Sequence, residues 1–198
     1  TQAILSRYAD RLRVVSEPDH GQADAINKGF RLAQGSIMGW LNSDDLYLSG
    51  AISAVVRFFQ THPKINFVYG DVLAMDARNH LYGVRTHVRQ TDYRDLVMRG
   101  DFIVQPAAFW RSSLWRAIGE LDTSLHYTLD YDYWLRSAEQ FELRYIPVFL
   151  AADRLHSSAK TARGGAARLL ELASLGHRYG QTQLPLSFRG QAAAESAA

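Results

Sequence analysis

Two adjacent carboxylates, Asp44 and Asp45, follow a short apolar run at residues 37–41. An uninterrupted run of this length is typical of a strand that is buried on both faces, as in a parallel sheet. Ligands bind at the carboxyl edge of open α/β sheets, and two neighbouring negative charges attract a cation there. Hard divalent ions are often held by one or two carboxylates together with substrate phosphates. The pair therefore predicts a Mg²⁺ or Mn²⁺ site that holds a diphosphate, although a solvated turn before a helix explains the same residues equally well.

A second candidate site lies where a predicted strand at residues 13–17 ends and a predicted helix at residues 22–34 begins. Free backbone N–H groups and the positive end of the helix dipole make such a junction an anion site. Gln22, Asp24 and Lys28 project near it, and the Lys28 ammonium is able to meet a phosphate as a point charge. Ordinary capping, with Lys28 a solvated surface charge, is the competing interpretation.

A third cluster begins the helix predicted at residues 130–140. Asp130 stands at its N-cap and Asp132 in its first turn, where carboxylates compensate the helix terminus. A carboxylate here is also a candidate general base for an attacking hydroxyl. The helix terminus lowers the pKa of a carboxylate, whereas nearby phosphates or burial against Tyr131 and Trp134 raise it. The sequence leaves this balance open.

A lone histidine, His156, follows the strand predicted at residues 142–150 and precedes a polar loop. Such a histidine is more often a satisfied surface or core residue than a ligand, yet a neutral imidazole is able to complete the coordination of Mn²⁺. Lys160 and Thr161 in the same loop are placed to close over a phosphate. The sequence has no Gly-x-x-x-x-Gly-Lys phosphate loop, no Gly-x-Ser-x-Gly elbow and no His-Glu-x-x-His zinc helix.

The elements that must position these residues follow from apolar periodicity. Spacings of three and four residues indicate helices, and short apolar runs between turn residues indicate strands. The expected helices cover residues 1–8, 22–34, 50–61, 91–99, 112–118, 130–140 and 162–178. The expected strands cover residues 13–17, 37–41, 66–75, 81–88, 105–111 and 142–150, with a bend at Gly70 and a bulge or edge position at Pro147. Strand, helix and strand in succession over residues 13–41 predict a parallel unit with a crossover helix.

Composition limits the classes of protein that fit. The 198 residues are 47% hydrophobic, which is enough for one full core, and we expect one domain at residues 1–179 with a polar, disordered tail at residues 180–198. The net charge of +2 does not support nucleic-acid binding, and the lack of cysteine excludes disulfides and thiolate chemistry. No apolar run approaches the ~18 residues of a transmembrane helix, and we expect no signal peptide within these residues. Because the chain begins with Thr1 rather than Met, we expect it to be a fragment.

Taken together, four ordered blocks make the chain resemble the inverting glycosyltransferases of family 2, which have the GT-A fold. The blocks are residues 16–29 with Trp40-Leu41-Asn42-Ser43-Asp44-Asp45, then Gln105-Pro106 with Phe109-Trp110-Arg111, then Leu121-Asp122, and finally Asp130-Tyr131-Asp132-Tyr133-Trp134-Leu135-Arg136. The resemblance covers residues 1–161. It implies an α/β fold in which helices flank a mixed, mostly parallel sheet.

The resemblance also implies a function. Its members take a nucleotide-diphosphate sugar, such as a UDP-, GDP- or dTDP-sugar, as donor and a carbohydrate or lipid-linked hydroxyl as acceptor, with Mg²⁺ or Mn²⁺ as cofactor. The implied metal ligands are Asp45 and His156, and the implied catalytic base is Asp130. The implied donor contacts are Gln22, Asp24, Lys28, Asp44 and Asp45, and the expected acceptor or sugar contacts are Trp110, Arg111, Tyr131 and Asp132. Trp134 is either a further part of an apolar floor for a sugar ring or a core residue.

The chain departs from the family pattern in places. Asn42 stands where many relatives carry Asp, and Leu129 stands where many carry Glu before the base. The family's first strand and its Asp-rich uridine-binding turn would precede Thr1, so we expect residues 1–198 alone to bind donor poorly.

Two rival functions remain open at this stage. A non-catalytic sugar or nucleotide binder that keeps the fold is favoured by Asn42 and Leu129. A nucleotidyltransferase also uses a metal and a similar sheet, and it would release pyrophosphate instead of a nucleoside diphosphate. The family resemblance implies cell-surface polysaccharide, glycoprotein or glycolipid assembly, in the cytoplasm or at the inner face of the cell membrane. Acceptor choice is expected to depend on residues 76–101 and on the helices after Thr161.

Overall fold

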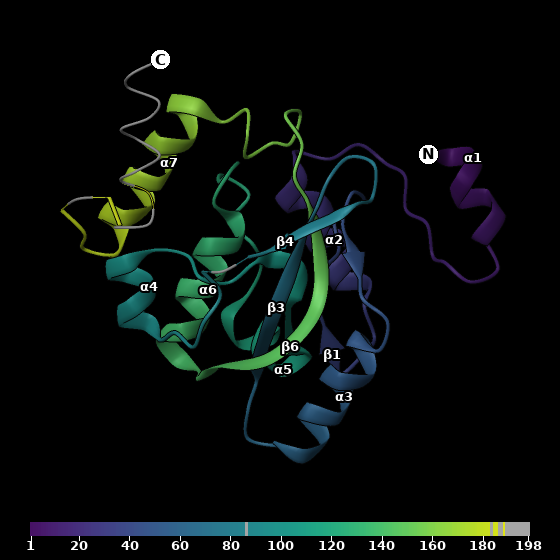
Figure 1. The fold of residues 1–198 in the computed structure, drawn as a ribbon, viewed down its shortest axis with the longest axis horizontal. Helices are drawn as coiled ribbons and strands as arrows, with labels where there is room; N and C mark the ends of the chain where they lie inside the picture. Colours follow the sequence, from purple (N-terminus) through teal and green to yellow (C-terminus); the bar gives the residue numbers. More distant parts are fainter. Residues whose placement is uncertain (86, 183, 186–187, 189–198) are drawn as a thin grey trace.

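The central feature of the structure, a computed structural model, is a mixed β-sheet (Figure 1). The structure describes residues 1–85, 87–182, 184–185 and 188. Within them the strands are β1 (Ile37–Met38), β2 (Leu46–Tyr47), β3 (Phe67–Met75), β4 (Leu81–Val84), β5 (Ala108–Arg111) and β6 (Leu143–Arg154). Their order across the sheet is β1-β5-β3-β6-β2, and β4 pairs with β3 outside this path. The predicted mixed sheet is confirmed, but the expectation that it is mostly parallel is wrong, because among the described strands only β3 and β6 pair in parallel.

Helices lie close to where the periodicity predicts them. They are α1 (Gln2–Leu5), η1 (Ser6–Tyr8), α2 (Gln22–Leu32), α3 (Ala51–Thr61), α4 (Tyr93–Arg99), η2 (Gln105–Ala107), α5 (Ser112–Ile118), α6 (Leu129–Gln140) and α7 (Gly165–Arg178). The short helix η2 occupies the first half of the strand that was expected at residues 105–111, and only its second half pairs as β5.

The parallel unit predicted over residues 13–41 does not form, which corrects that prediction. Residues 13–17 are not a strand, and Val14 and Val15 are 43% and 47% exposed. A strand needs a neighbour for its backbone N–H and C=O groups, and no strand of the described sheet pairs with this segment. The run at residues 37–41 pairs only through β1, antiparallel to β5, and the chain then leaves the sheet at Gly39.

A bulge in β6 interrupts its register with β3. The parallel register between β3 and β6 places Gly70 opposite Ile146 and Asp71 opposite Phe149, so Pro147 and Val148 are extra residues in β6. A side chain at Gly70 would meet the Val148 carbonyl oxygen at 2.5 Å, and glycine is therefore required for this close approach. The bulge expected at Pro147 is confirmed, and it lies opposite Gly70, where a bend was expected.

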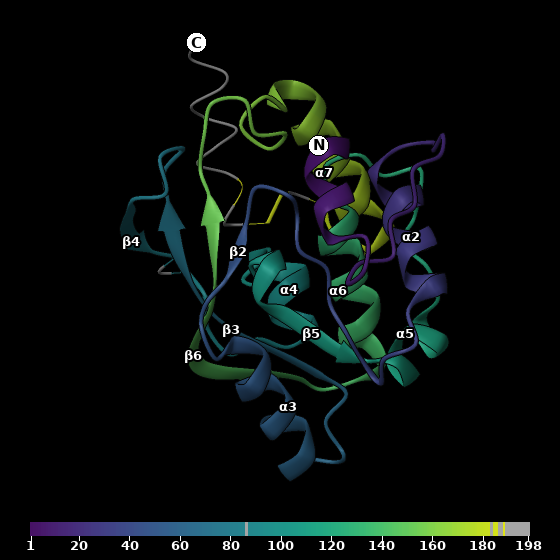
Figure 2. The same ribbon diagram turned by 90° about the vertical axis from the view of Figure 1, so that its right-hand side faces the viewer.

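Two hydrophobic cores lie on opposite faces of the sheet, because side chains alternate along β3. Phe67 and Tyr69 point into the larger core, which α2, α4, α5, α6 and α7 cover. Val68 points into the smaller core beneath α3. Figure 2 shows the larger set of helices beside the sheet and α3 below it. Trp110 and Trp134 are fully buried in the larger core, with ring centroids 5.8 Å apart.

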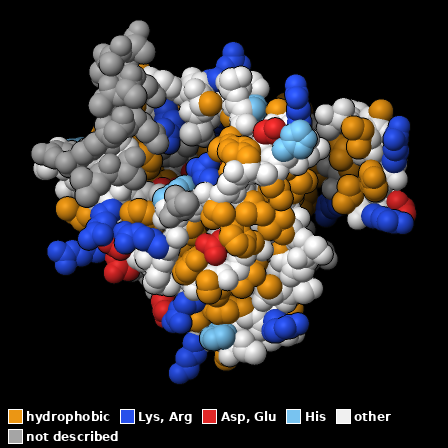
Figure 3. Space-filling view, viewed as in Figure 1, with side chains coloured by type: hydrophobic (Ala, Val, Ile, Leu, Met, Phe, Trp, Pro, Cys, Tyr) orange, Lys and Arg blue, Asp and Glu red, His pale blue; other side chains and the backbone are white. Residues whose placement is uncertain are grey.

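The outer part of the sheet carries exposed apolar side chains. Figure 3 shows apolar side chains gathered across the middle of the face that it presents. The exposed large apolar residues of β4 and β6 are Leu81, Tyr82, Val84, Val148 and Phe149. None of the helices in the described part of the chain has the length and apolar character that crossing a bilayer requires.

Asn27 connects α2 to the segment that leads into α6, and its removal should destabilise the fold. The fully buried Asn27 amide donates to the Leu121 carbonyl oxygen and accepts from the Leu121 N–H, both at 2.9 Å. Asn27→Ala leaves both backbone groups buried and unpaired, which should lower the free energy of unfolding by about 3 kcal/mol in urea denaturation. The control Asn66→Ala removes a half-buried amide with weaker contacts at 3.3 and 3.4 Å. Equal losses in the two variants would contradict this role for Asn27.

Candidate active site

A cavity of about 700 Å³ brings together residues that the sequence places far apart. Of the predicted site residues, the cavity is lined by Gln22, Asp44, Asp45, Asp130 and Tyr131. Lys160 and Thr161, from the loop after β6, line it as well. Asp45 and Asp130, the implied metal ligand and the implied base, therefore face one common space, whereas His156, the other implied metal ligand, is not among the residues that line it.

The pairing of β2 with β6 positions the two adjacent carboxylates. Leu46 lies opposite Ala152, so the residues just before β2 lie beside the end of β6. The Arg154 N–H donates to Asp45 Oδ1 at 2.9 Å, and the Arg154 Nε donates to the carbonyl oxygen of Asp44 at 2.8 Å. Burial raises the pKa of Asp45, the bond from Arg154 opposes this rise, and the charge of Asp44 adds to it.

His156 contacts Asp44 rather than Asp45. Its Nε2 atom lies 3.3 Å from Asp44 Oδ2, and its Nδ1 atom lies 2.7 Å from the Ser158 hydroxyl oxygen. The described residues contain no group of three His, Asp or Glu side chains arranged to hold an ion. One or two carboxylates and an imidazole nevertheless suit Mg²⁺ or Mn²⁺ when substrate phosphates supply the other ligands. The side chains present thus fit a cation that binds together with a diphosphate.

A chain of amide side chains crosses the cavity wall and explains why Asn42 is not a carboxylate. Asn42 Nδ2 donates to Gln105 Oε1 at 2.8 Å and to Asp45 Oδ2 at 3.3 Å. Its Oδ1 accepts from Gln22 Nε2 at 3.3 Å, and the Lys160 ammonium donates to Gln22 Oε1 at 2.7 Å. An ionised Asp at position 42 has no proton to donate and would place a further negative charge beside Asp45.

The predicted base, Asp130, lies in the first turn of α6, where its Oδ1 accepts from the Tyr131 N–H at 2.8 Å. Burial raises the pKa of Asp130, and it outweighs that hydrogen bond and the positive charges of Arg168 and Lys160. A second carboxylate, Asp101, lines the same cavity. Burial also raises the pKa of Asp101 well above its ordinary value, and the charge of Asp130 adds to the rise. A carboxylate with a raised pKa is a stronger base than one in water.

Sequence reasoning missed several residues of this site. Asp101, Arg154 and Arg168 line the cavity, and Trp40 lies in its wall with its ring stacked on Trp134 at 6.0 Å. The available signals were Gly100, whose φ of +108° marks the sharp turn before Asp101, and the position of Asp101 just ahead of the Gln105-Pro106 block. Nothing in the sequence pattern points to Arg168.

Asp24 and Lys28 lie outside the cavity and stabilise the turn before α2. The Lys28 ammonium lies 3.1 Å from Glu17 and donates to the Pro18 carbonyl oxygen at 2.7 Å. Asp24 accepts from the His20 N–H at 3.0 Å and lies 3.5 Å from Lys28. Lys28 lines a separate pocket of about 370 Å³. Both side chains therefore contact the segment before α2 in this structure, and their predicted contact with a donor stays a prediction.

Three predicted sugar contacts, Trp110, Arg111 and Asp132, also lie outside the cavity. Trp110 is fully buried, and the Arg111 guanidinium donates to the carbonyl oxygens of Phe59 and Ile65 at 2.7 and 3.0 Å. Asp132 is 1% exposed and accepts from Arg136 at 2.8 Å. Because their polar atoms are engaged within the fold, we assign these residues a structural role in place of the predicted contact. Trp134 is likewise a core residue.

The part of the predicted tail that the structure describes packs against the site. Phe188 lines the cavity and its ring lies 5.8 Å from that of Tyr131. Residues 183, 186–187 and 189–198 of the predicted disordered tail lie outside the described residues.

Comparisons with known proteins point to one family. The family described as "Glycosyl transferase family 2" matches residues 1–116. A "PGL/p-HBAD biosynthesis glycosyltransferase" of Mycobacterium tuberculosis is 30% identical over 146 residues, covering 72% of this chain and 54% of that protein. An uncharacterized glycosyltransferase of Rickettsia typhi is 26% identical over 167 residues, covering 81% of this chain and 52% of that protein. The chain thus spans about half the length of these relatives.

Solved structures share the fold at low sequence identity. Residues 1–349 of TarS of S. aureus, in complex with UDP-GlcNAc, give a TM-score of 0.66 at 10% identity, over 98% of this chain and 58% of that one. The mannosyltransferase PcManGT of Pyrobaculum calidifontis, in complex with GDP-Man and Mn²⁺, gives 0.58 at 16% identity, over 98% of this chain and 56% of that one. These likenesses identify the mixed sheet and its helices as the GT-A glycosyltransferase fold.

Proposed function

Since the chain belongs to glycosyl transferase family 2, we propose that it takes part in moving a sugar from a nucleotide-diphosphate sugar to an acceptor hydroxyl, with inversion at the anomeric carbon. The observation that carries this proposal is that Asp45 and Asp130, far apart in the sequence, line one cavity. A donor-side carboxylate and a half-buried carboxylate of raised pKa in one space are the groups that this reaction needs.

The donor end of the cavity is assigned to Gln22, Asp44 and Asp45. Asp44 and Asp45, which line this end, would hold Mg²⁺ or Mn²⁺, with His156, 3.3 Å from Asp44 Oδ2, as a further ligand. When bound, such an ion supplies Lewis-acid neutralisation of the charge on the diphosphate. The two structural neighbours, which are in complex with UDP-GlcNAc and with GDP-Man, support a nucleotide hexose as donor. Trp40, which is half-buried and lines the cavity, offers an apolar surface for a sugar ring, in place of the fully buried Trp110.

The acceptor end is assigned to Asp130 and Tyr131. In the proposed step, the acceptor oxygen attacks the anomeric carbon while its proton passes to the Asp130 carboxylate. The bond from the anomeric carbon to the diphosphate oxygen breaks, and the nucleoside diphosphate leaves with the electron pair. Attack from the side opposite the leaving group inverts the anomeric configuration, which follows the family resemblance. The hydroxyl belongs to a polysaccharide, glycolipid or glycoprotein precursor, and nucleotide sugars place the reaction on the cytoplasmic side of the membrane.

A donor screen tests this function. The full-length protein is incubated with Mn²⁺, a panel of UDP-, GDP- and dTDP-hexoses and hydroxyl acceptors, and mass spectrometry follows the nucleotide products. We expect one donor to yield a nucleoside diphosphate and a glycoside, and Asp130→Asn to yield neither above the enzyme-free rate. Pyrophosphate as the product would instead indicate a nucleotidyltransferase. Tight binding without turnover by any donor would indicate a non-catalytic binder.

A further inference from the structure

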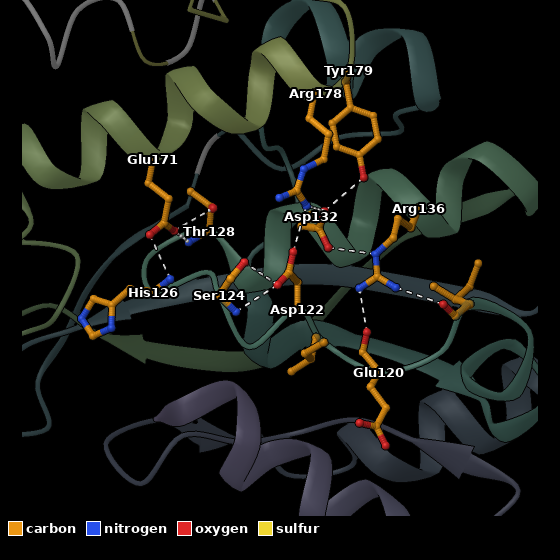
Figure 4. Close-up of polar contacts among 12 residues, drawn as sticks. Glu120, Asp122, Ser124, His126, Thr128, Asp132, Arg136, Glu171, Arg178 and Tyr179 are labelled. Atoms are coloured by element: carbon orange, nitrogen blue, oxygen red, sulfur yellow. Dashed lines mark hydrogen bonds and ion pairs between the residues drawn. The ribbon is translucent and has the colours of Figure 1, made fainter. Parts of the chain in front are cut away.

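A carboxylate on α7, the last helix in the described part of the chain, binds the backbone segment just before the proposed base. One carboxylate oxygen of Glu171, on α7, accepts from the N–H of His126 at 2.9 Å. The other oxygen accepts from the N–H of Tyr127 at 2.6 Å, and from the N–H and the hydroxyl of Thr128 at 2.8 Å each. Figure 4 shows Glu171 reaching from α7 to His126 and Thr128. Three successive N–H groups that converge in this way form an anion-binding concavity, and here a side chain of the same chain fills it.

The residues at the C-terminal end of α7 contact α6 at a second point. Tyr179, directly after α7, donates from its hydroxyl to Asp132 Oδ1 at 3.1 Å, and Arg178 Nη1 lies 3.5 Å from that oxygen. Asp132 is 1% exposed, so these contacts are made away from solvent. In the sequence, Asp130 therefore lies between Thr128 and Asp132. Thr128 is hydrogen-bonded to Glu171 on α7, and Asp132 to Tyr179 just after it.

Glu171 is ionised at neutral pH, and its negative charge strengthens the hydrogen bonds that it accepts. Burial raises its pKa, but the hydrogen bonds from His126, Thr128 and Tyr127 together bring the pKa below its ordinary value. Hydrogen bonds to an ionised acceptor are about twice as strong as neutral ones. Glu171 itself does not line the cavity, whereas Arg168 and Leu172 on the same helix do. Its influence on a bound substrate must therefore pass through the backbone that it holds.

We propose that Glu171 is a positioning residue for the transfer reaction: by fixing residues 126–128, it sets the orientation of the Asp130 carboxylate in the cavity. This inference rests on the proposed function. It gives α7 a role in positioning the proposed base, although this helix lies beyond the residues that match the family. A base that is displaced by about 1 Å can lose 100-fold in rate, so a rigid support for Asp130 has a large expected effect.

The test compares Glu171→Ala and Glu171→Gln with a control, Glu120→Ala, in the whole protein. Glu120 is an ion-paired carboxylate, bound by Arg31, that does not line the cavity. We measure kcat and KM for the donor, the binding of UDP with Mn²⁺, and the carboxyl carbon signal of Asp130 by NMR, assigned with Asp130→Asn. We expect Glu171→Ala to lower kcat by roughly 100-fold with UDP binding unchanged, and to shift the Asp130 signal. Glu171→Gln keeps one acceptor oxygen and should recover part of the rate, and Glu120→Ala should match the wild type.

Two results would overturn the inference or separate it from the proposed function. If Glu171→Ala or Glu171→Gln melts at a lower temperature but keeps the wild-type kcat and Asp130 signal, Glu171 serves stability alone. If the wild type turns over no nucleotide sugar, the proposed function fails, and the Asp130 signal still decides whether Glu171 positions that carboxylate.

Discussion

Replacing Asp130 by Asn should reduce kcat by roughly 10²–10⁴-fold while nucleoside diphosphate binding stays nearly intact. Asn cannot accept the proton of the acceptor hydroxyl, but it keeps the shape of the side chain and the oxygen that accepts from the Tyr131 N–H. Transfer is measured by mass spectrometry, and UDP binding with Mn²⁺ by isothermal titration. The matched control is Asp95→Asn, which alters a first-turn aspartate of α4 that does not line the cavity. Transfer at the wild-type rate by Asp130→Asn would place the base elsewhere.

The same substitution should not weaken the fold, which separates loss of chemistry from loss of structure. Burial raises the pKa of Asp130 in the folded state, so the folded protein holds this proton more tightly than the unfolded chain does. Stability from this group is therefore greatest at low pH and declines as the pH rises from the ordinary aspartate pKa through the raised one. At neutral pH the ionised side chain opposes folding, and Asn removes that cost. Thermal unfolding of Asp130→Asn at pH 7 should occur at or above the wild-type temperature.

The raised pKa also sets the acid side of the rate profile. The base works only when it is ionised, so kcat should fall as the pH drops through the pKa of Asp130. Because burial raises that pKa, the fall should begin at a higher pH than for a solvent-exposed aspartate. Asp101 and Asp130 influence each other, so the profile reports the pair rather than one residue.

The second large effect is expected from Asp45→Asn, which should lower transfer on the order of 100-fold or more by removing charge that faces the donor. It should also abolish the rise in unfolding temperature that Mn²⁺ with UDP produces in the wild type, because a ligand stabilises only the state that binds it. The hydrogen bond from the Arg154 N–H survives, since the Asn side-chain oxygen accepts it in place of Asp45 Oδ1. Differential scanning fluorimetry with and without Mn²⁺ and UDP measures this effect.

Asp44→Asn is the matched comparison, because the structure and the family resemblance favour different ligands. The resemblance assigns the metal to Asp45, whereas His156 contacts Asp44. If Asp44→Asn abolishes the Mn²⁺ effect and Asp45→Asn leaves it, then Asp44 is the ligand and Asp45 has the structural role that its contacts with Arg154 and Asn42 suggest.

Most helices could be predicted from the sequence, because their signals are local. The helix at α6 begins within one residue of its predicted start, since the periodicity of its buried side chains and the polar residues before it lie within a single stretch. The predicted strand at residues 13–17 failed for the opposite reason. A strand is stabilised by a neighbour, and the apolar pattern of Val14 and Val15 carries no information about whether that neighbour exists.

The same distinction between local signals and contacts with other elements applies to the residues of the candidate site. The adjacent carboxylates Asp44 and Asp45 and the helix-start Asp130 were visible as residue types next to expected strand and helix ends. Asp101 and Glu171 were not, because each acquires its role from a partner on another element: Asp101 from Asp130, and Glu171 from the turn at residues 126–128.

The amino-acid sequence by itself determined the family, the helices and the carboxylates that are able to do chemistry, because these depend on residue type and short-range spacing. Only the tertiary structure decided which groups meet. The pairing of β2 with β6 sets Asp44 against His156, and the packing of α7 on the start of α6 secures the turn before Asp130. A helix terminus lowers the pKa of Asp130 and burial raises it, and in the folded protein the effect of burial is the larger. Burial is a property of the assembled cavity and not of any segment that forms it.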